Sequence, residues 1–158
     1  MKLSENAYKK IDQELTKYPE DKKISAVMSA LRIAQTELGW LPTEVIEDVA
    51  RYLQIPPIAA LEVATFYNMY NVQPVGKFKI TICTNLPCAL SGGNHAALYL
   101  KKKLGVDFNE TTFDQRFTLK QGECLGACGD APVLLLNNHT MHSFMTNEKI
   151  DALLEELK

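Results

Sequence analysis

Residues 77–83, KFKITIC, open the second half of this 158-residue chain and decide its fold. Polar and apolar side chains alternate along residues 77–82, which is the pattern of a strand with one buried face. Cys83 follows this strand directly, and Cys88 lies a few residues further on. The stretch therefore predicts a sheet that carries a pair of cysteines where one of its strands ends.

The sequence after residue 83 alternates between helix and strand patterns. We expect a helix over residues 91–104, with Ser91 as its cap and Gly105 at its end. Strands are expected over residues 116–120, 133–136 and 140–144, with a turn at 137–138, and a last helix over residues 147–157. This order suits a small mixed sheet with helices packed on it, for which a thioredoxin-like arrangement is the simplest match.

The sequence before residue 77 carries helix patterns instead. Apolar side chains recur every three or four residues over residues 24–38, and Gly39 ends this helix. Thr43 is the expected cap of a second helix, and Pro57 suits the first turn of a third. The chain is therefore predicted to be α+β, with a helical bundle over residues 1–75 and a thioredoxin-like α/β domain over residues 76–158.

Composition excludes several classes of protein. The chain is 46% hydrophobic and 23% charged, as in ordinary globular proteins. Its formal net charge of -2 and its few arginines disfavour nucleic acid as a partner. No apolar run approaches the roughly 20 residues that span a bilayer, so direct membrane insertion is not expected. The N-terminal residues lack a secretory apolar segment, which favours a cytoplasmic protein whose thiols stay reduced.

All four cysteines fall into two close pairs, spaced Cys83-x4-Cys88 and Cys124-x3-Cys128. Both pairs follow predicted strands, whereas cysteines that only fill a core would be scattered over strand and helix faces. Four thiolates on two loops suit a [2Fe–2S] cluster. Cys88 is expected just before the helix over residues 91–104, whose first N–H groups would stabilise negative charge on its sulfur. The second pair is surrounded by glycines, which let backbone N–H groups come close to sulfur: Gly122, Gly126 and Gly129.

A structural zinc site is the main alternative, because zinc knuckles use spacings of C-x2–4-C. The apolar strands and helices should fold without a metal, and a two-iron cluster suits wider ligand loops, so the cluster is favoured. A thioredoxin-type redox pair is disfavoured because no C-x-x-C is present. Three histidines are disfavoured as ligands because none lies beside a cysteine in the sequence: His95, His139 and His142. The chain also lacks the glycine-rich motifs that bind nucleotides.

Three separated motifs resemble one known family. Residues 83–88, CTNLPC, and residues 123–132, ECLGACGDAP, resemble the two cluster loops of the 24 kDa subunit (the E-subunit) of NADH–quinone oxidoreductase, also called respiratory complex I. Residues 62–70, EVATFYNMY, resemble the end of that family's helical region. The resemblance implies a helical bundle followed by a thioredoxin-like ferredoxin domain. It also implies that one [2Fe–2S] cluster is ligated by four cysteines: Cys83, Cys88, Cys124 and Cys128.

The same resemblance implies the partners of the chain. In this family NADH and FMN are bound by a flavoprotein subunit that also holds a [4Fe–4S] cluster. Both subunits belong to a larger membrane-associated complex, here expected on the cytoplasmic side of the inner membrane. Related subunits serve NAD-linked hydrogenases and formate dehydrogenases, so these hosts stay open, as does a zinc-stabilised adaptor. A free shuttle ferredoxin is disfavoured, because the helical half would have no use in it.

Two local features carry further expectations. The helical bundle is expected to help dock the flavoprotein subunit through Phe66, Tyr67 and Tyr70, unless these aromatic side chains only pack the two halves together. The step from Ala131 to Pro132 resembles the cis-proline position of thioredoxin folds, so a cis peptide bond is expected there.

Overall fold

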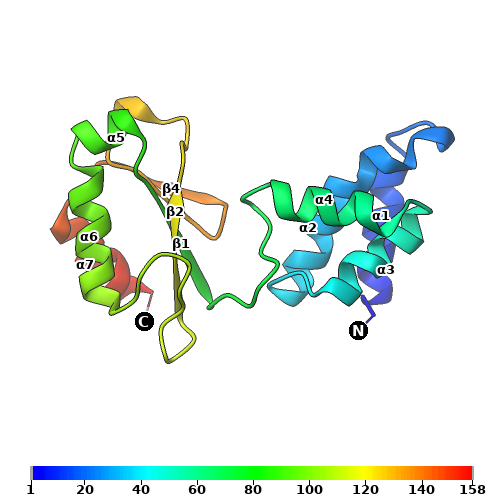
Figure 1. The fold of residues 1–158 in the computed structure, drawn as a ribbon, viewed down its shortest axis with the longest axis horizontal. Coiled ribbons are helices and arrows are strands. Elements are labelled where there is room, and N and C mark those ends of the chain that lie inside the picture. Colours follow the sequence, from blue (N-terminus) through cyan, green and yellow to red (C-terminus); the bar gives the residue numbers. More distant parts are fainter. Residues whose placement is uncertain (1, 158) are drawn as a thin grey trace. The chain divides into compact units, whose positions relative to one another are not determined.

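The computed structural model describes residues 2–157. The chain divides into two compact units, and the boundary along the chain lies between Pro74 and Val75. Figure 1 shows helices alone in the first unit and a sheet with helices in the second. The α+β class predicted from the sequence is confirmed. No helix within residues 2–157 is both long enough and apolar enough to cross a membrane.

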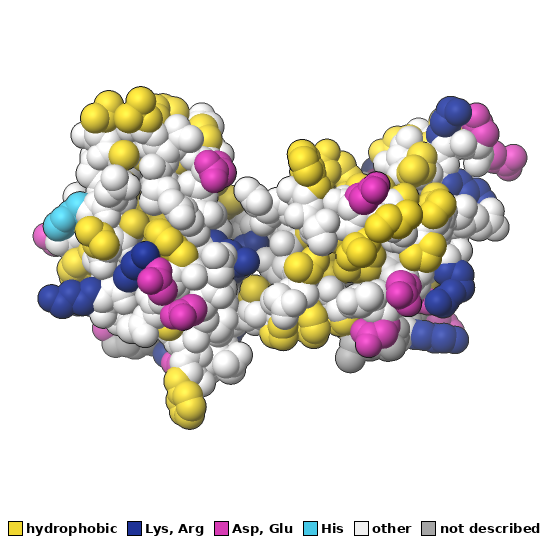
Figure 2. Space-filling model, viewed as in Figure 1, with side chains coloured by type: hydrophobic (Ala, Val, Ile, Leu, Met, Phe, Trp, Pro, Cys, Tyr) yellow, Lys and Arg dark blue, Asp and Glu magenta, His cyan; other side chains and the backbone are white. Residues whose placement is uncertain are grey.

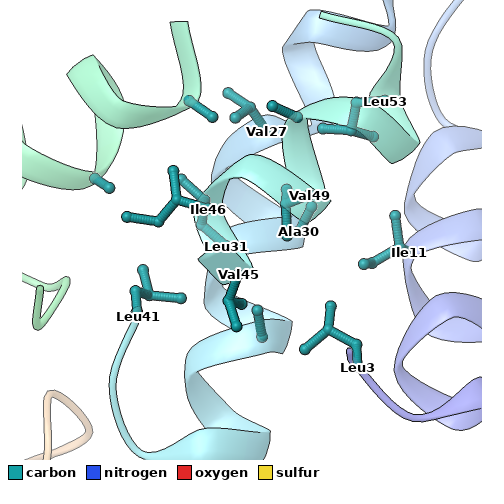
Figure 3. Packing of buried hydrophobic residues seen from close by; sticks show 14 of the residues in the cluster. Leu3, Ile11, Val27, Ala30, Leu31, Leu41, Val45, Ile46, Val49 and Leu53 are labelled. Carbon is teal, nitrogen blue, oxygen red and sulfur yellow. The ribbon is translucent and has the colours of Figure 1, made fainter. Parts of the chain in front are cut away.

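The first unit packs four α-helices and a short 3₁₀ segment around one apolar core. Its elements are α1 (Glu5–Leu15), η1 (Glu20–Ala26), α2 (Val27–Leu38), α3 (Thr43–Leu53) and α4 (Pro57–Phe66). Side chains from α1, α2 and α3 meet in this core, among them the fully buried Ile11, Ala30 and Val49 (Figure 3). Gly39 ends α2 as predicted, with a φ of +82° that favours glycine.

The cap predicted for α3 is wrong. Pro42 precedes the helix, and Thr43 is its first residue, with no side-chain hydrogen bond capping the start. The reason is that the proline fixes an extended backbone at its own position, so the chain enters the helix one residue earlier. The buried stripe of α3 is unaffected by this shift, because it depends on the helical period rather than on the cap.

Burial separates the three aromatic side chains that were expected at a docking surface. Tyr70 is buried, and its hydroxyl donates a hydrogen bond of 2.8 Å to the carbonyl oxygen of Met28. Phe66 is 76% exposed and packs edge-on against Tyr67, with 5.0 Å between ring centroids. Tyr70 therefore stabilises the bundle, and Phe66 and Tyr67 are the two rings that reach the surface.

The second unit is built on a four-stranded sheet in the order β2-β1-β3-β4. Its elements are β1 (Phe78–Cys83), α5 (Leu86–Leu90), α6 (Gly93–Leu104), β2 (Phe117–Gly122), η2 (Cys128–Asp130), β3 (Leu134–Leu136), β4 (Thr140–His142) and α7 (Asn147–Glu156). β1 is parallel to β2, whereas β3 is antiparallel to both β1 and β4. The small mixed sheet predicted from the sequence is confirmed, and α6 lies in the crossover that a parallel pair requires.

Alternate residues of the strands build the core of this unit. Ile80 and Ile82 of β1 and Leu119 of β2 are fully buried, together with Leu100 of α6 and Ile150 of α7. In Figure 1, α6 and α7 lie on the same side of the sheet, which is the side that these residues face. The apolar residues Ile80 and Ile82 of the alternating stretch 77–82 therefore lie on the packed face of β1, as the pattern predicted.

The segments beside the sheet differ from the prediction at two places. Ser91 does not cap the following helix; its N–H donates to the carbonyl oxygen of Cys88 over 3.1 Å and ends α5, and α6 begins at Gly93. Cys88 consequently lies within a short helix rather than in an open loop. β4 ends two residues earlier than expected, where Phe144 turns to donate its N–H to the carbonyl oxygen of Asp130 over 2.8 Å.

Candidate iron–sulfur site

Parallel pairing brings the two cysteine loops to the same edge of the sheet. Cys83, the last residue of β1, lies opposite Gly122, the last residue of β2. Beyond this pair the N–H of Thr84 donates to the carbonyl oxygen of Gly122 over 3.2 Å. Gly122 has little room, because a Cβ there would lie 3.0 Å from the Cγ2 of Thr81. The two loops that carry the remaining cysteines thus start from adjacent, closely packed strand ends.

Cys83 and Cys88 form the buried side of the site. Both side chains are almost fully buried and pack against Val133. The N–H of Cys83 donates to the carbonyl oxygen of Val133 over 3.1 Å, and its thiol donates to the carbonyl oxygen of Glu123 over 3.7 Å. Glu123 and Val133 stand before and after the second cysteine pair, so Cys83 contacts the backbone on both sides of that pair.

Gly93, the first residue of α6, fits tightly against the backbone of both buried cysteines. A Cβ at this position would lie 2.7 Å from the carbonyl oxygen of Cys88 and 3.0 Å from that of Cys83. Because these neighbours are backbone atoms, they could not give way without moving the cysteines. This packing role was not predicted from the sequence, although the adjacent glycines at 92 and 93 were a signal for close approach.

Cys124 and Cys128 form the exposed side of the site. Both lie on the loop after β2, and Cys128 is the first residue of η2. Gly126, between them, has a φ of +73°, a conformation that favours glycine and turns the loop. The peptide bond between Ala131 and Pro132, which closes this loop, is cis as expected.

Burial raises the pKa of the Cys88 thiol above its ordinary value. Its hydrogen bond with the Cys83 side chain raises this pKa further, and so do the charges of Cys83 and Cys128, whereas a backbone hydrogen bond at Val133 lowers it. Cys83 and Cys128 thus both lie close enough to act on Cys88. Thiols in such a place bind metal by releasing their protons, so metal binding here would be coupled to deprotonation.

The four cysteines are arranged as two pairs, one buried and one exposed, and all four are free thiols. Within residues 2–157, no three Cys, His, Asp or Glu side chains are grouped as the ligands of a single metal ion. Four thiols on two adjacent loops are the donor set of a [2Fe–2S] cluster. The chemistry of the residues present therefore fits that group.

The three histidines lie on other segments. His95 is on α6, where its Nε2 is 3.4 Å from the side-chain amide of Asn147. His139 lies in the turn before β4, with its N–H donating to the carbonyl oxygen of Leu136 over 3.0 Å. His142 is the last residue of β4, and its Nε2 is buried. The structure gives none of them a place in the cysteine loops.

Apolar side chains cover the surface beside the buried cysteine pair. Leu86 and Leu90 lie one turn apart on α5 and are 69% and 81% exposed, whereas Cys88 between them is buried. Figure 2 shows apolar side chains gathered at the end of the second unit that carries α5. We call Leu86 and Leu90 the α5 patch. The segment was expected to be a loop. The sequence therefore did not predict the helix that exposes Leu86 and Leu90 while it buries Cys88.

Comparison with known proteins identifies relatives over nearly the whole chain. Residues 11–158 match the family described as thioredoxin-like [2Fe-2S] ferredoxin. The chain is 46% identical over 143 residues to the NADH-quinone oxidoreductase E-subunit of Rickettsia felis, a match that covers 90% of this chain and 85% of the relative. It is 39% identical over 148 residues to an NADH-quinone oxidoreductase E-subunit of Rhizobium meliloti, covering 94% of this chain and 86% of the relative.

Solved structures share the fold. An NAD+-reducing [NiFe]-hydrogenase in the air-oxidized state contains a chain that matches with a TM-score of 0.73 and 20% identity, over 89% of this chain and 24% of that chain. The structure of such an enzyme in the H2-reduced state gives a TM-score of 0.72 and 21% identity, over 83% and 22%. The present chain thus spans about a quarter of those chains. By its sequence it belongs to the thioredoxin-like [2Fe–2S] ferredoxin family and, within it, to the E-subunits of NADH–quinone oxidoreductase.

Proposed function

We propose that the chain is an electron-transfer subunit whose one [2Fe–2S] cluster is ligated by Cys83, Cys88, Cys124 and Cys128. The observation that carries this assignment is the register of β1 and β2, which starts both cysteine loops from adjacent strand ends. The type of cluster follows from the family, and the role as one subunit of an oxidoreductase follows from the relatives of the same name. The chain contributes an electron carrier to that enzyme and not a complete active site.

The residues of the chain have separate tasks in this function. When bound, a [2Fe–2S] cluster takes up and releases single electrons. The two cysteine pairs bind it as thiolates, having released their protons. Val133 and its apolar neighbours keep water away from the buried pair. Gly93 and the paired ends of β1 and β2 hold the backbone in place, so that the ligands move little when the charge of the site changes.

The α5 patch supports a protein partner at the cluster. An electron carrier without a nucleotide-binding motif must receive its electrons from another protein. Leu86 and Leu90 lie on the same short helix as the buried Cys88, so a partner seated on them is separated from the site by the thickness of one helix. Apolar contacts there would also exclude water. We assign this patch to the flavoprotein subunit that binds NADH, FMN and a [4Fe–4S] cluster.

The helical bundle offers a second surface to the same subunit. A shallow groove at the end of α4 is lined by Glu62, Val63, Thr65, Phe66 and Tyr67. The exposed ring of Phe66, steadied edge-on by Tyr67, supplies the kind of aromatic anchor that interfaces use. We assign docking of the flavoprotein subunit to Phe66 and Tyr67 and to the α5 patch together.

The cellular place of the protein follows from its proposed host. The chain would act on the cytoplasmic side of the inner membrane as part of a larger membrane-associated complex.

Reduction of the purified chain by NADH tests the proposed function. We expect its visible absorbance to bleach when NADH and the purified flavoprotein subunit are both present, and to stay constant with NADH alone. The double variant L86S/L90S should be reduced roughly tenfold more slowly, because the apolar contact is lost. The matched control is Leu98→Ser, a comparably exposed leucine on α6. Wild-type chain that carries its cluster but is not reduced under these conditions would contradict the proposal.

A further inference from the structure

Residues 143–145, which join β4 to α7, are bonded to the loop that carries the exposed cysteine pair. The N–H of Phe144 donates to the carbonyl oxygen of Asp130 over 2.8 Å, and the N–H of Met145 donates to that of Pro132 over 2.9 Å. Two successive backbone groups thus hold one short segment of the cysteine loop. We call residues 143–145 the strap.

The segment that receives these bonds connects the two cysteine pairs. Asp130 ends η2, the short helix whose first residue is Cys128. On the other side, Pro132 is followed by Val133, which packs against the buried pair and accepts the N–H of Cys83 over 3.1 Å. A strap that fixes this segment therefore fixes a ligand of the exposed pair on one side and the packing of the buried pair on the other.

Both ends of the strap are attached to the core of the second unit. His142, the residue before it, is the last of β4, and Met145 is buried in the apolar core. Thr146, the residue after it, caps α7 by accepting the N–H of Lys149 over 3.4 Å. The Nζ of Lys149 also donates to the carbonyl oxygen of Ser143 over 3.3 Å. The strap therefore ties the position of the cysteine loop to that of β4 and α7.

Phe144 has the backbone conformation that makes both bonds possible. In an extended strand successive N–H groups point to opposite sides, whereas those of Phe144 and Met145 reach the same segment of the loop. The φ of +52° at Phe144 turns the second N–H to the side of the first. This left-handed region is costly for most side chains and most costly for β-branched ones. The ring of Phe144 is 51% exposed, so its packing does little to offset that cost.

We propose that Phe144 is a positioning residue for the cluster ligands, because its left-handed backbone closes the strap and so holds the cysteine loop in place. This inference rests on the proposed function, since it requires a cluster at the four cysteines. Phe144 acts through Asp130 and Pro132 and is not itself a ligand. When the strap opens, the exposed pair loses its support, because Cys124 and Cys128 lie outside the apolar packing that holds the buried pair.

Three substitutions of Phe144 separate the effect of its backbone from that of its ring. Phe144→Val places a β-branched side chain in the left-handed region, so the strap should open. Phe144→Gly and Phe144→Asn accept this conformation, so the strap should stay closed although the ring is gone. Met141→Val is the matched control, because it introduces the same side chain at an exposed position of β4, where valine is favoured.

The rate of cluster release measures the effect of each substitution. Each purified, cluster-loaded chain is mixed with an iron chelator, and the loss of visible absorbance is followed. We expect release to be roughly tenfold faster in Phe144→Val than in wild type. The Gly and Asn variants and the Met141→Val control should release at close to the wild-type rate. Loss of the cluster from Phe144→Val during purification, with a native circular dichroism spectrum, is the same result in its extreme form.

Two further measurements distinguish positioning of the ligands from general stability. The EPR signal of the reduced cluster depends on the surroundings of its irons, so it should shift or broaden in Phe144→Val and regain its wild-type form in Phe144→Asn. Hydrogen exchange at the N–H groups of Phe144 and Met145 should be faster in Phe144→Val, whereas exchange in β1 should be unchanged.

An unchanged release rate in Phe144→Val would overturn the proposal. Equal changes in all three Phe144 variants would also overturn it, because the ring and not the backbone would then be responsible. So would general destabilisation of Phe144→Val, seen as faster exchange throughout β1 with an unchanged EPR signal, or as loss of the native circular dichroism spectrum. A wild-type chain that binds no [2Fe–2S] cluster would contradict the proposed function itself, whereas a loaded wild type with indifferent variants would contradict this inference alone.

Discussion

The thiol of Cys83 lies 3.7 Å from the carbonyl oxygen of Glu123, which is 40 positions later in the chain and precedes Cys124 directly. This contact follows from the parallel pairing of β1 and β2, which sets Cys83 opposite Gly122. Because the sheet fixes the backbone before either loop begins, the separation of the two cysteine pairs depends on strand register. A ligand set built on paired strands is more precisely positioned than one held by loops alone.

Replacing Gly93 with alanine should remove most of the bound cluster. The added Cβ would meet the carbonyl oxygens of Cys88 and Cys83 at 2.7 and 3.0 Å, so the loop with both buried ligands must shift. Iron content and visible absorbance of the purified variant measure the loss. Gly129→Ala is the matched control, because a Cβ there meets nothing within 4 Å. Full iron content in Gly93→Ala would show that this packing does not position the ligands.

Replacing Tyr70 with phenylalanine should destabilise the helical unit by about 1 kcal/mol, because the carbonyl oxygen of Met28 would lose its hydrogen bond in a buried place. Urea unfolding followed by far-UV circular dichroism measures the change. Phe66→Ala should leave the unfolding midpoint nearly unchanged, since its ring is largely exposed. A reversed order of the two effects would mean that Phe66, and not Tyr70, belongs to the core.

Lys79 should make the stability of the chain rise with pH. Burial, together with a smaller effect of the positive charge of Lys120, lowers the pKa of this amine from 10.5 to about 8. Between these two values the unfolded chain holds a proton that the folded chain does not, so the free energy of unfolding increases with pH in that window. Urea midpoints at pH 7 and pH 9.5 measure the rise.

Lys79→Met is the matched variant for this test. Its free energy of unfolding should lack the rise between pH 8 and 10.5, because methionine has no amine to titrate. Other groups titrate in both proteins and cancel in the difference. The same pH dependence in wild type and Lys79→Met would refute the assignment to this lysine.

Much of the fold could be predicted because it rests on local patterns. The alternation over residues 77–82 marked β1, and the glycines at 39 and 105 ended helices with the positive φ that glycine favours. The start of α6 could not be predicted, because Ser91 is also a good helix cap and its N–H is instead taken by Cys88. The helix begins at Gly93 and not after Ser91, and Gly93 packs against the backbone of Cys88 and Cys83, a long-range contact that the sequence does not show.

Sequence patterns could not predict which side chains of the site are buried and which are exposed. Phe66, Tyr67 and Tyr70 follow one another at the end of a helix, where no periodicity tells a core ring from a surface ring. Leu86 and Leu90 became a surface patch because α5 turns Cys88 inward between them. The pairing of the cysteines along the chain was visible in the sequence, whereas the burial of one pair and the exposure of the other depend on long-range packing.

Metal and sulfide analysis of the purified chain tests the central claim most directly, with the Cys124→Ala variant measured beside it. The account predicts about two iron and two sulfide per wild-type chain. It also predicts that the EPR signal of the reduced cluster is lost in Cys124→Ala, because one ligand of the exposed pair is gone. One zinc per colourless wild-type chain, or an unchanged EPR signal in Cys124→Ala, would contradict the assignment of the four cysteines as cluster ligands.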